Sequence, residues 1–114
     1  MEANDYQKSA HGFAMYKDGL YPILGLAEKA GEAAGNVAKN FNVVYLRVVG
    51  RLNAHAPDVP FSESLKSEIG DICWLVAEIC TMYGWTLSEV MEQNIEKLTD
   101  RRNRDVICGE GDNR

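Results

Sequence analysis

A helix stop is followed almost at once by a helix start in residues 83–89, and this junction limits the folds open to the chain. Gly84 can adopt the left-handed conformation that commonly ends a helix. Thr86 and Glu89 have the spacing of a capping box, in which each side chain binds a backbone N–H of the first helical turn. The sequence therefore predicts two successive helices with a very short connection, one ending at Tyr83 and one beginning after Thr86.

Apolar residues recur at spacings of three and four on both sides of this junction. The set before it is Leu65, Ile69, Ile72, Val76, Ile79 and Tyr83, and the set after it is Leu87, Met91 and Leu98, with Asn94 continuing the rhythm. This period places each set on one face of a helix, and we expect both faces to be buried. The first helix is predicted to begin with Ser62 or Ser64 as its N-cap, and the second to end near Asp105.

The earlier part of the chain also favours helices. We predict one over Asp5–Tyr16 and another from Pro22, which suits a first helical turn, to Lys39. Residues 40–52 include enough β-branched side chains for a strand, but they fit an extension of the helix that ends at Lys39 equally well. Pro57 and Pro60 predict a loop over residues 53–62. The predicted fold is a single all-α domain, residues 1–114, built as a four-helix bundle.

Composition excludes several classes of protein. A net charge of −5 argues against a surface for a nucleic-acid polymer, which is normally basic. The chain has neither a signal-peptide pattern nor an apolar run of about 18 residues, so we expect no membrane partner. Its three cysteines lack metal-type pairing and are predicted to be free, buried thiols, which suits the reducing cytoplasm.

Two pairs of acidic residues interrupt the predicted helices. Glu68 and Asp71 are three apart beside an apolar face, and Glu28 and Glu32 are four apart on a helix rich in Ala and Gly. Small residues let helices approach closely, so these carboxylates can converge. Converging carboxylates need a hard divalent cation, and oxygen ligands favour Mg²⁺ or Mn²⁺. The alternative is that these acids are solvated on the flanks of the bundle, with Glu28 paired to a nearby lysine.

The last predicted helix contains a polar residue on its apolar stripe. Asn94 is expected to be buried and hydrogen-bonded, and Lys97 and Arg101 follow one and two turns later. These three side chains can orient an anionic ligand beside a metal site. The alternative is a core asparagine next to solvated basic residues that favour the C-terminal end of the helix dipole.

Taken together, four segments resemble the MazG-like all-α nucleoside triphosphate pyrophosphohydrolases. They read "YPILGLAEKAGEAAGNVAK", "LKSEIGDICWLVAEI", "GWTLSEVMEQNIEKLTDRR" and "GEGDNR", and cover nearly the whole chain. The hallmark of the family is an ExxE pair on one helix and an ExxD pair on a later one. Glu68 and Asp71 match the second pair, and Glu32 matches the last residue of the first.

Position 29 departs from the family pattern. Relatives usually read "EEAGE" where this chain reads "EKAGE", so Lys29 takes the place of the first glutamate of the pair. Glu28 is the nearest substitute, but lies about 100° around the helix. The exchange changes the local charge by two units. It can displace one metal ion or bring an ammonium to the phosphates, and it leaves the level of activity open.

The resemblance implies hydrolysis of a ribo- or deoxyribonucleoside triphosphate to the monophosphate and pyrophosphate, as nucleotide-pool housekeeping. It implies Mg²⁺, with Mn²⁺ as a substitute, held by Glu32, Glu68 and Asp71 as catalytic ligands, with Glu28 as a further candidate. The candidates for binding substrate are Asn94, Lys97, Arg101, Lys29, Asp112 and Arg114. It also implies a homodimer or homotetramer.

Two other functions remain open at this point. Lys29 leaves room for a nucleotide-binding or regulatory module of the same fold with weakened catalysis. A helical protein-interaction domain, whose carboxylates only decorate the surface, is the alternative from a different class.

Overall fold

The computed structural model describes residues 1–39, 59–109 and 111–113. Four helices make up the regular structure of these residues, α1 (Ala3–His11), α2 (Leu20–Lys39), α4 (Val59–Tyr83) and α5 (Leu87–Asn103), and no strand is found among them. The all-α prediction is confirmed for this part of the chain. The predictions for residues 40–58 and for Arg114 lie outside the described residues.

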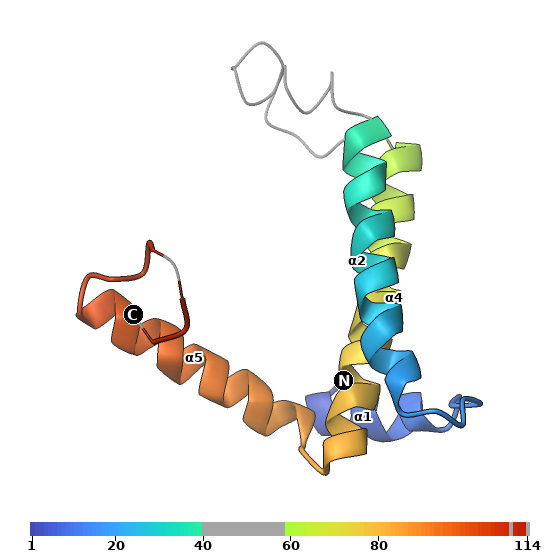
Figure 1. Cartoon of the computed structure of the whole chain (residues 1–114), viewed down its shortest axis with the longest axis horizontal. Coiled ribbons are helices and arrows are strands. Elements are labelled where there is room, and N and C mark those ends of the chain that lie inside the picture. Colours follow the sequence, from blue (N-terminus) through green and yellow to red (C-terminus); the bar gives the residue numbers. More distant parts are fainter. Residues whose placement is uncertain (40–58, 110, 114) are drawn as a thin grey trace.

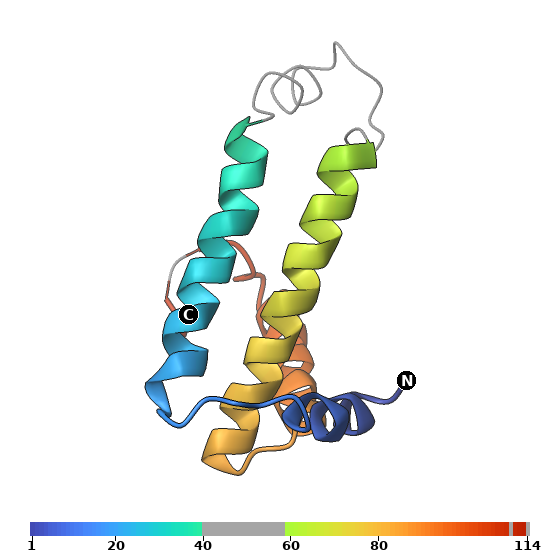
Figure 2. The ribbon, with the colours of Figure 1, turned by 90° about the vertical axis from the view of Figure 1, so that its right-hand side faces the viewer.

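The helices form an antiparallel hairpin with two additions at one end. α2 runs alongside α4, and α1 lies across the C-terminal end of α4 (Figures 1 and 2). α5 packs on α1 and then extends away from the α2–α4 hairpin (Figure 1). Within one chain the four helices therefore do not close into a bundle, and the predicted bundle would need helices from another copy.

The junction between α4 and α5 forms as predicted. Gly84 has φ 72°, and the N–H of Trp85 donates to the carbonyl of Cys80 at 2.9 Å, which closes the end of α4. At the start of α5, Thr86 Oγ1 accepts from the N–H of Glu89 at 3.2 Å, and Glu89 Oε1 accepts from the N–H of Thr86 at 2.8 Å. The capping box is confirmed.

The other helix ends differ from the predictions. α4 begins at Val59, upstream of both Ser62 and Ser64, because a proline such as Pro60 is tolerated in a first turn, where its missing N–H is not needed. α1 ends at His11, and the chain turns at once through Gly12. α2 begins at Leu20, whose N–H donates to Asp18 Oδ1 at 2.9 Å.

The buried core lies where α1, α4 and α5 meet. It consists of Ala10, Ala77, Cys80 and Leu87, with Trp74 and Val90 among the residues packed against it. The predicted seam of α4 is not buried in one chain: Ile69 is 48% exposed and Tyr83 is 56% exposed. The α5 stripe is likewise exposed at Met91 and Leu98, and so is Asn94. These predictions are wrong for the single chain because α5 extends away from the hairpin beyond its first turn (Figure 1).

One glycine allows the close approach expected between α2 and α4. A Cβ on Gly25 would lie 3.0 Å from Cδ2 of Leu75, which is tighter than ordinary van der Waals contact. Gly31 would meet no such neighbour. The three cysteines are free as predicted, but only Cys80 is buried, and Cys73 and Cys108 are exposed. Of the helices described, none combines the length and apolarity that a membrane span requires.

Candidate functional site

The predicted metal ligands come from the two helices of the hairpin. Glu32 lies three residues after Lys29 on α2, and Asp71 lies three residues after Glu68 on α4. Residues three apart share a face of a helix. Because α2 and α4 are packed side by side, these two faces meet, and the carboxylates converge as the sequence suggested.

A single ammonium group lies among the three carboxylates. Lys29 Nζ donates to Glu32 Oε2 at 3.1 Å and lies 3.3 Å from Asp71 Oδ2 and 3.8 Å from Glu68 Oε2. The ion pairs therefore link α2 to α4 as well as joining neighbours on α2. Among the described residues, the ion pairs of this acidic cluster involve Lys29, Glu32, Glu68 and Asp71, and Glu28 is exposed and takes no part in them.

The close packing of these groups changes their proton affinities. The hydrogen bond from Lys29 to Glu32, followed by that to Asp71, raises the pKa of Lys29 and outweighs its partial desolvation. Glu32 and Glu68 also share a hydrogen bond, which lowers the pKa of Glu32 and raises the pKa of Glu68. Lys29 further lowers the pKa of Glu32, and burial further raises that of Glu68.

The donor chemistry of the acidic cluster fits a hard divalent cation. Glu68 Oε2 is buried and accepts no hydrogen bond in the structure, although only 19% of its side chain is exposed. A buried carboxylate oxygen without a donor is costly, and a cation would satisfy it. As the side chains stand, no three His, Cys, Asp or Glu residues of the described ranges are arranged to hold a metal ion. Lys29 supplies the cation that the carboxylates share.

A second set of candidate residues lies on α5 and the C-terminal tail. Lys97 Nζ lies 3.0 Å from Asp112 Oδ1, and the NH2 group of Arg101 donates to the backbone oxygen of Asp112 at 2.8 Å and to Oδ1 at 3.0 Å. The tail folds back through Gly109 and Gly111, which both have positive φ. Its carboxylate therefore occupies the position between the two cations where an anionic ligand was predicted.

The tail contact has two electrostatic consequences. The hydrogen bond from Lys97, followed by that from Arg101, lowers the pKa of Asp112. Arg101 is buried, with only 6% of its side chain exposed, and Asp112 supplies a negative charge beside it. Asn94 is exposed on α5, which runs away from the hairpin (Figure 1). A single chain thus brings Glu32, Glu68 and Asp71 together but leaves the α5 candidates apart from them.

A buried acid on α4 is not among the residues that the sequence predicted for a site. Glu78 has no exposed surface, and its Oε2 lies 3.0 Å from His11 Nδ1 and accepts from the Tyr16 hydroxyl at 3.1 Å. Its Oε1 is buried with no hydrogen-bond partner in the structure. The signal was present, since Glu78 is the one charged residue in the apolar run 72–83.

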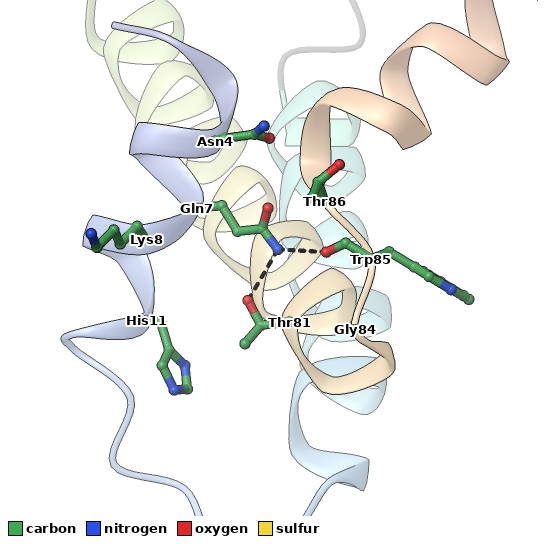
Figure 3. A pocket seen from close by; sticks show the side chains of 8 residues that line it. All are labelled: Asn4, Gln7, Lys8, His11, Thr81, Gly84, Trp85 and Thr86. Atoms are coloured by element: carbon green, nitrogen blue, oxygen red, sulfur yellow. Dashed lines mark hydrogen bonds between the residues drawn. The ribbon is translucent and has the colours of Figure 1, made fainter.

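A cavity of about 460 Å³ lies between α1 and the α4–α5 junction (Figure 3). Gln7 crosses it, and its Nε2 donates to Thr81 Oγ1 at 3.2 Å and to the Trp85 carbonyl at 2.8 Å. Gln7 Oε1 also accepts from the N–H of Leu87 at 2.7 Å. The polar groups near the centre of this cavity thus serve to fasten α1 to the junction. None of the predicted site residues lines it.

Comparison with known proteins identifies the family of the chain. Residues 21–106 match the family described as the MazG nucleotide pyrophosphohydrolase domain, a span that contains Glu32, Glu68 and Asp71. The Gene 37 protein of Mycobacterium phage L5 is 33% identical over 123 aligned positions, which cover 100% of both chains. No solved structure matches the chain. The family match spans most of the chain, which therefore belongs to the MazG nucleotide pyrophosphohydrolase family.

Proposed function

We propose that this chain is a Mg²⁺-dependent nucleoside triphosphate pyrophosphohydrolase that acts in nucleotide-pool housekeeping. In this reaction water attacks the α-phosphorus of a ribo- or deoxyribonucleoside triphosphate, the bond to the bridging oxygen breaks, and the monophosphate and pyrophosphate are released. The observation that carries the proposal is the meeting of Glu32, Glu68 and Asp71 around one cationic point. These three residues lie on two helices of a chain that belongs to the MazG nucleotide pyrophosphohydrolase family.

The three carboxylates would hold the metal ion. Bound Mg²⁺ neutralises phosphate charge and lowers the pKa of a bound water, and Mn²⁺ has similar oxygen preferences. Glu68 would offer the buried oxygen that now has no hydrogen-bond partner. Glu32 and Asp71, which now contact Lys29, would complete the set, and one of the three carboxylates would accept the proton of the attacking water.

The α5 candidates would bind the nucleotide. Lys97 is suited to a phosphate oxygen, and Asn94 to metal-bound water or the nucleoside. Arg101 is a further phosphate contact, and the tail residues Asp112 and Arg114 would close over the substrate. In the present arrangement Asp112 pairs with both Lys97 and Arg101, so the substrate's phosphates would have to replace it.

We further propose a homodimer or homotetramer in which the site is completed by a second copy. α5 carries Asn94 and Lys97 away from the carboxylates of its own chain (Figure 1). Large apolar side chains also stand exposed on the helices that a second copy would cover, namely Leu20, Ile23, Leu24, Ile69, Met91, Ile95 and Leu98. Burying them against another chain would add the core that a single chain lacks.

A second function is favoured by Lys29. Its ammonium already satisfies part of the carboxylate charge, so the chain could bind a nucleotide with little turnover. The leading proposal predicts release of pyrophosphate from at least one ribo- or deoxyribonucleotide, standard or modified, in the presence of Mg²⁺. The second predicts no release but a rise in melting temperature with a non-hydrolysable triphosphate and Mg²⁺. If pyrophosphate is not released and the melting temperature does not rise, a helical interaction domain is the remaining interpretation.

A further inference from the structure

Lys29 is the feature that sets the acidic cluster of this chain apart from the two-pair pattern of its family. Its side chain is not a free surface lysine, because Nζ is held between carboxylates of two helices and only 31% of the side chain is exposed. Resting on the function proposed above, we propose that Lys29 is a permanent internal cation that takes the place of one divalent ion. Each chain then binds a single divalent cation beside it.

The charges of the cluster support a count of one. Ionised Glu32, Glu68 and Asp71 together with the Lys29 ammonium leave two negative charges, which one divalent cation balances. A glutamate at position 29 would leave four negative charges, which two divalent cations balance. The lysine therefore removes both a ligand and the charge that a second ion would need.

The distances from Lys29 Nζ indicate which carboxylate the single cation would contact. Lys29 Nζ is in direct contact with Glu32 Oε2 at 3.1 Å and lies 3.3 Å from Asp71 Oδ2, whereas Glu68 Oε2 is farther away at 3.8 Å. That oxygen is the buried one without a hydrogen bond. The ammonium thus contacts Glu32 and Asp71 more closely than Glu68, and Glu68 Oε2 is the oxygen that it leaves to the metal ion.

The same contacts argue against Lys29 as a ligand for the triphosphate. To reach a phosphate, the ammonium would have to leave two close carboxylates, Glu32 on α2 and Asp71 on α4. Removing it would also restore the repulsion among three acids. The cation is better explained as part of the resting site than as a group that moves to the substrate.

Counting bound Mn²⁺ tests the proposal without any reaction. The purified full-length protein is titrated with Mn²⁺ in the absence of nucleotide, and free ion is measured by electron paramagnetic resonance. We expect one Mn²⁺ per chain in the wild type and two in Lys29→Glu. Lys29→Met keeps the length of the side chain without charge or ligand, so it should still bind one ion. Its affinity should be at least about thirtyfold higher, because a positive charge about 4 Å from a doubly charged ion is gone.

A matched variant controls for net charge. Lys66 is exposed on α4, and Lys66→Glu makes the same change in charge as Lys29→Glu, so it should still bind one ion per chain. Two ions in the wild type, or no gain in Lys29→Glu, would overturn the proposal. If circular dichroism shows that Lys29→Glu does not fold, the test rests on Lys29→Met. A Mn²⁺ affinity of Lys29→Met equal to or weaker than that of the wild type would then overturn the proposal.

This inference and the proposed function can fail separately. A wild type that binds one Mn²⁺ and gains a second in Lys29→Glu, yet releases no pyrophosphate from any nucleotide, supports the role of Lys29 and refutes the activity. A wild type that hydrolyses nucleotides while binding two ions per chain supports the activity and refutes the role of Lys29.

Discussion

Nδ1 of His11, the last residue of α1, lies 3.0 Å from Oε2 of Glu78, a carboxylate on α4 that has no exposed surface. The hydroxyl of Tyr16 donates to the same oxygen at 3.1 Å. His11 and Tyr16 flank the turn that follows α1, so both ends of this turn are attached to one buried acid. The pairing gives α1 a polar anchor on the hairpin in addition to its small apolar core.

Removing the imidazole should destabilise the fold. We expect His11→Ala to lower the free energy of unfolding by about 2 kcal/mol, since a buried carboxylate that loses a hydrogen-bond partner keeps its desolvation cost. Lys8→Ala, an exposed site on the same helix, should change it by less than about 0.5 kcal/mol. Urea unfolding monitored by circular dichroism measures both, and equal stability of the two variants would contradict the anchor.

The contrast between this anchor and the α4–α5 junction shows what sequence can predict. The capping box of Thr86 and Glu89 was predictable because its partners are three residues apart and their geometry is local. Glu78 was visible as an acid within an apolar run, but its partners lie 67 and 62 residues away, one at the end of α1 and one in the segment between α1 and α2. Such contacts depend on how the helices pack, which periodicity does not determine.

The candidate site likewise has one feature that the sequence predicted and one that it did not. The spacing of Glu68 and Asp71 and the small residues of α2 predicted that carboxylates of the two helices would meet. The ion pairs around Lys29 show that they do. The apolar stripes were read as core, yet Ile69 and Met91 are exposed in one chain. Periodicity shows that a face avoids water, but it does not tell whether the face is covered by the same chain or by another copy.

The capping box itself offers a test of local stability. Thr86→Ala removes the oxygen that accepts from the N–H of Glu89, and we expect a loss of about 1 kcal/mol in the free energy of unfolding. Thr99→Ala makes the same chemical change in the interior of α5, where alanine is the better helix former, and should not destabilise. A Thr86→Ala protein as stable as Thr99→Ala would show that the cap contributes nothing.

The tail contact should respond to acid. Because Lys97 and Arg101 lower the pKa of Asp112 in the folded state, the contact stabilises the fold above the ordinary aspartate pKa of about 3.9. It is lost as the pH falls through the lowered pKa. The carboxyl carbon of Asp112 followed by NMR should titrate with a midpoint below about 3.9. A midpoint at or above that value would mean that the tail does not bind the two cations in solution.

An exposed apolar residue on α5 tests the assembly. Ile95 is 62% exposed in the single chain, and Ile95→Glu should lower the oligomeric state because burying its charge in an interface is unfavourable. Sedimentation velocity compares it with Glu96→Gln, an exposed neighbour on the same helix. If both variants sediment as the wild type does, α5 is not part of an interface at this position.

The effect of one metal-ligand substitution on pyrophosphate release tests whether these carboxylates hold the catalytic metal ion. Asp71→Asn keeps the size of the side chain but removes the charge that would hold the metal ion, whereas Glu63→Gln removes an exposed acid elsewhere on α4. With Mg²⁺ and the best nucleotide substrate, we predict that Asp71→Asn lowers the rate by at least about a hundredfold. Such a loss is larger than that expected for a residue that only hydrogen-bonds to a metal ligand. Glu63→Gln should keep the wild-type rate. Equal rates for Asp71→Asn and the wild type would contradict a hydrolase built on these carboxylates.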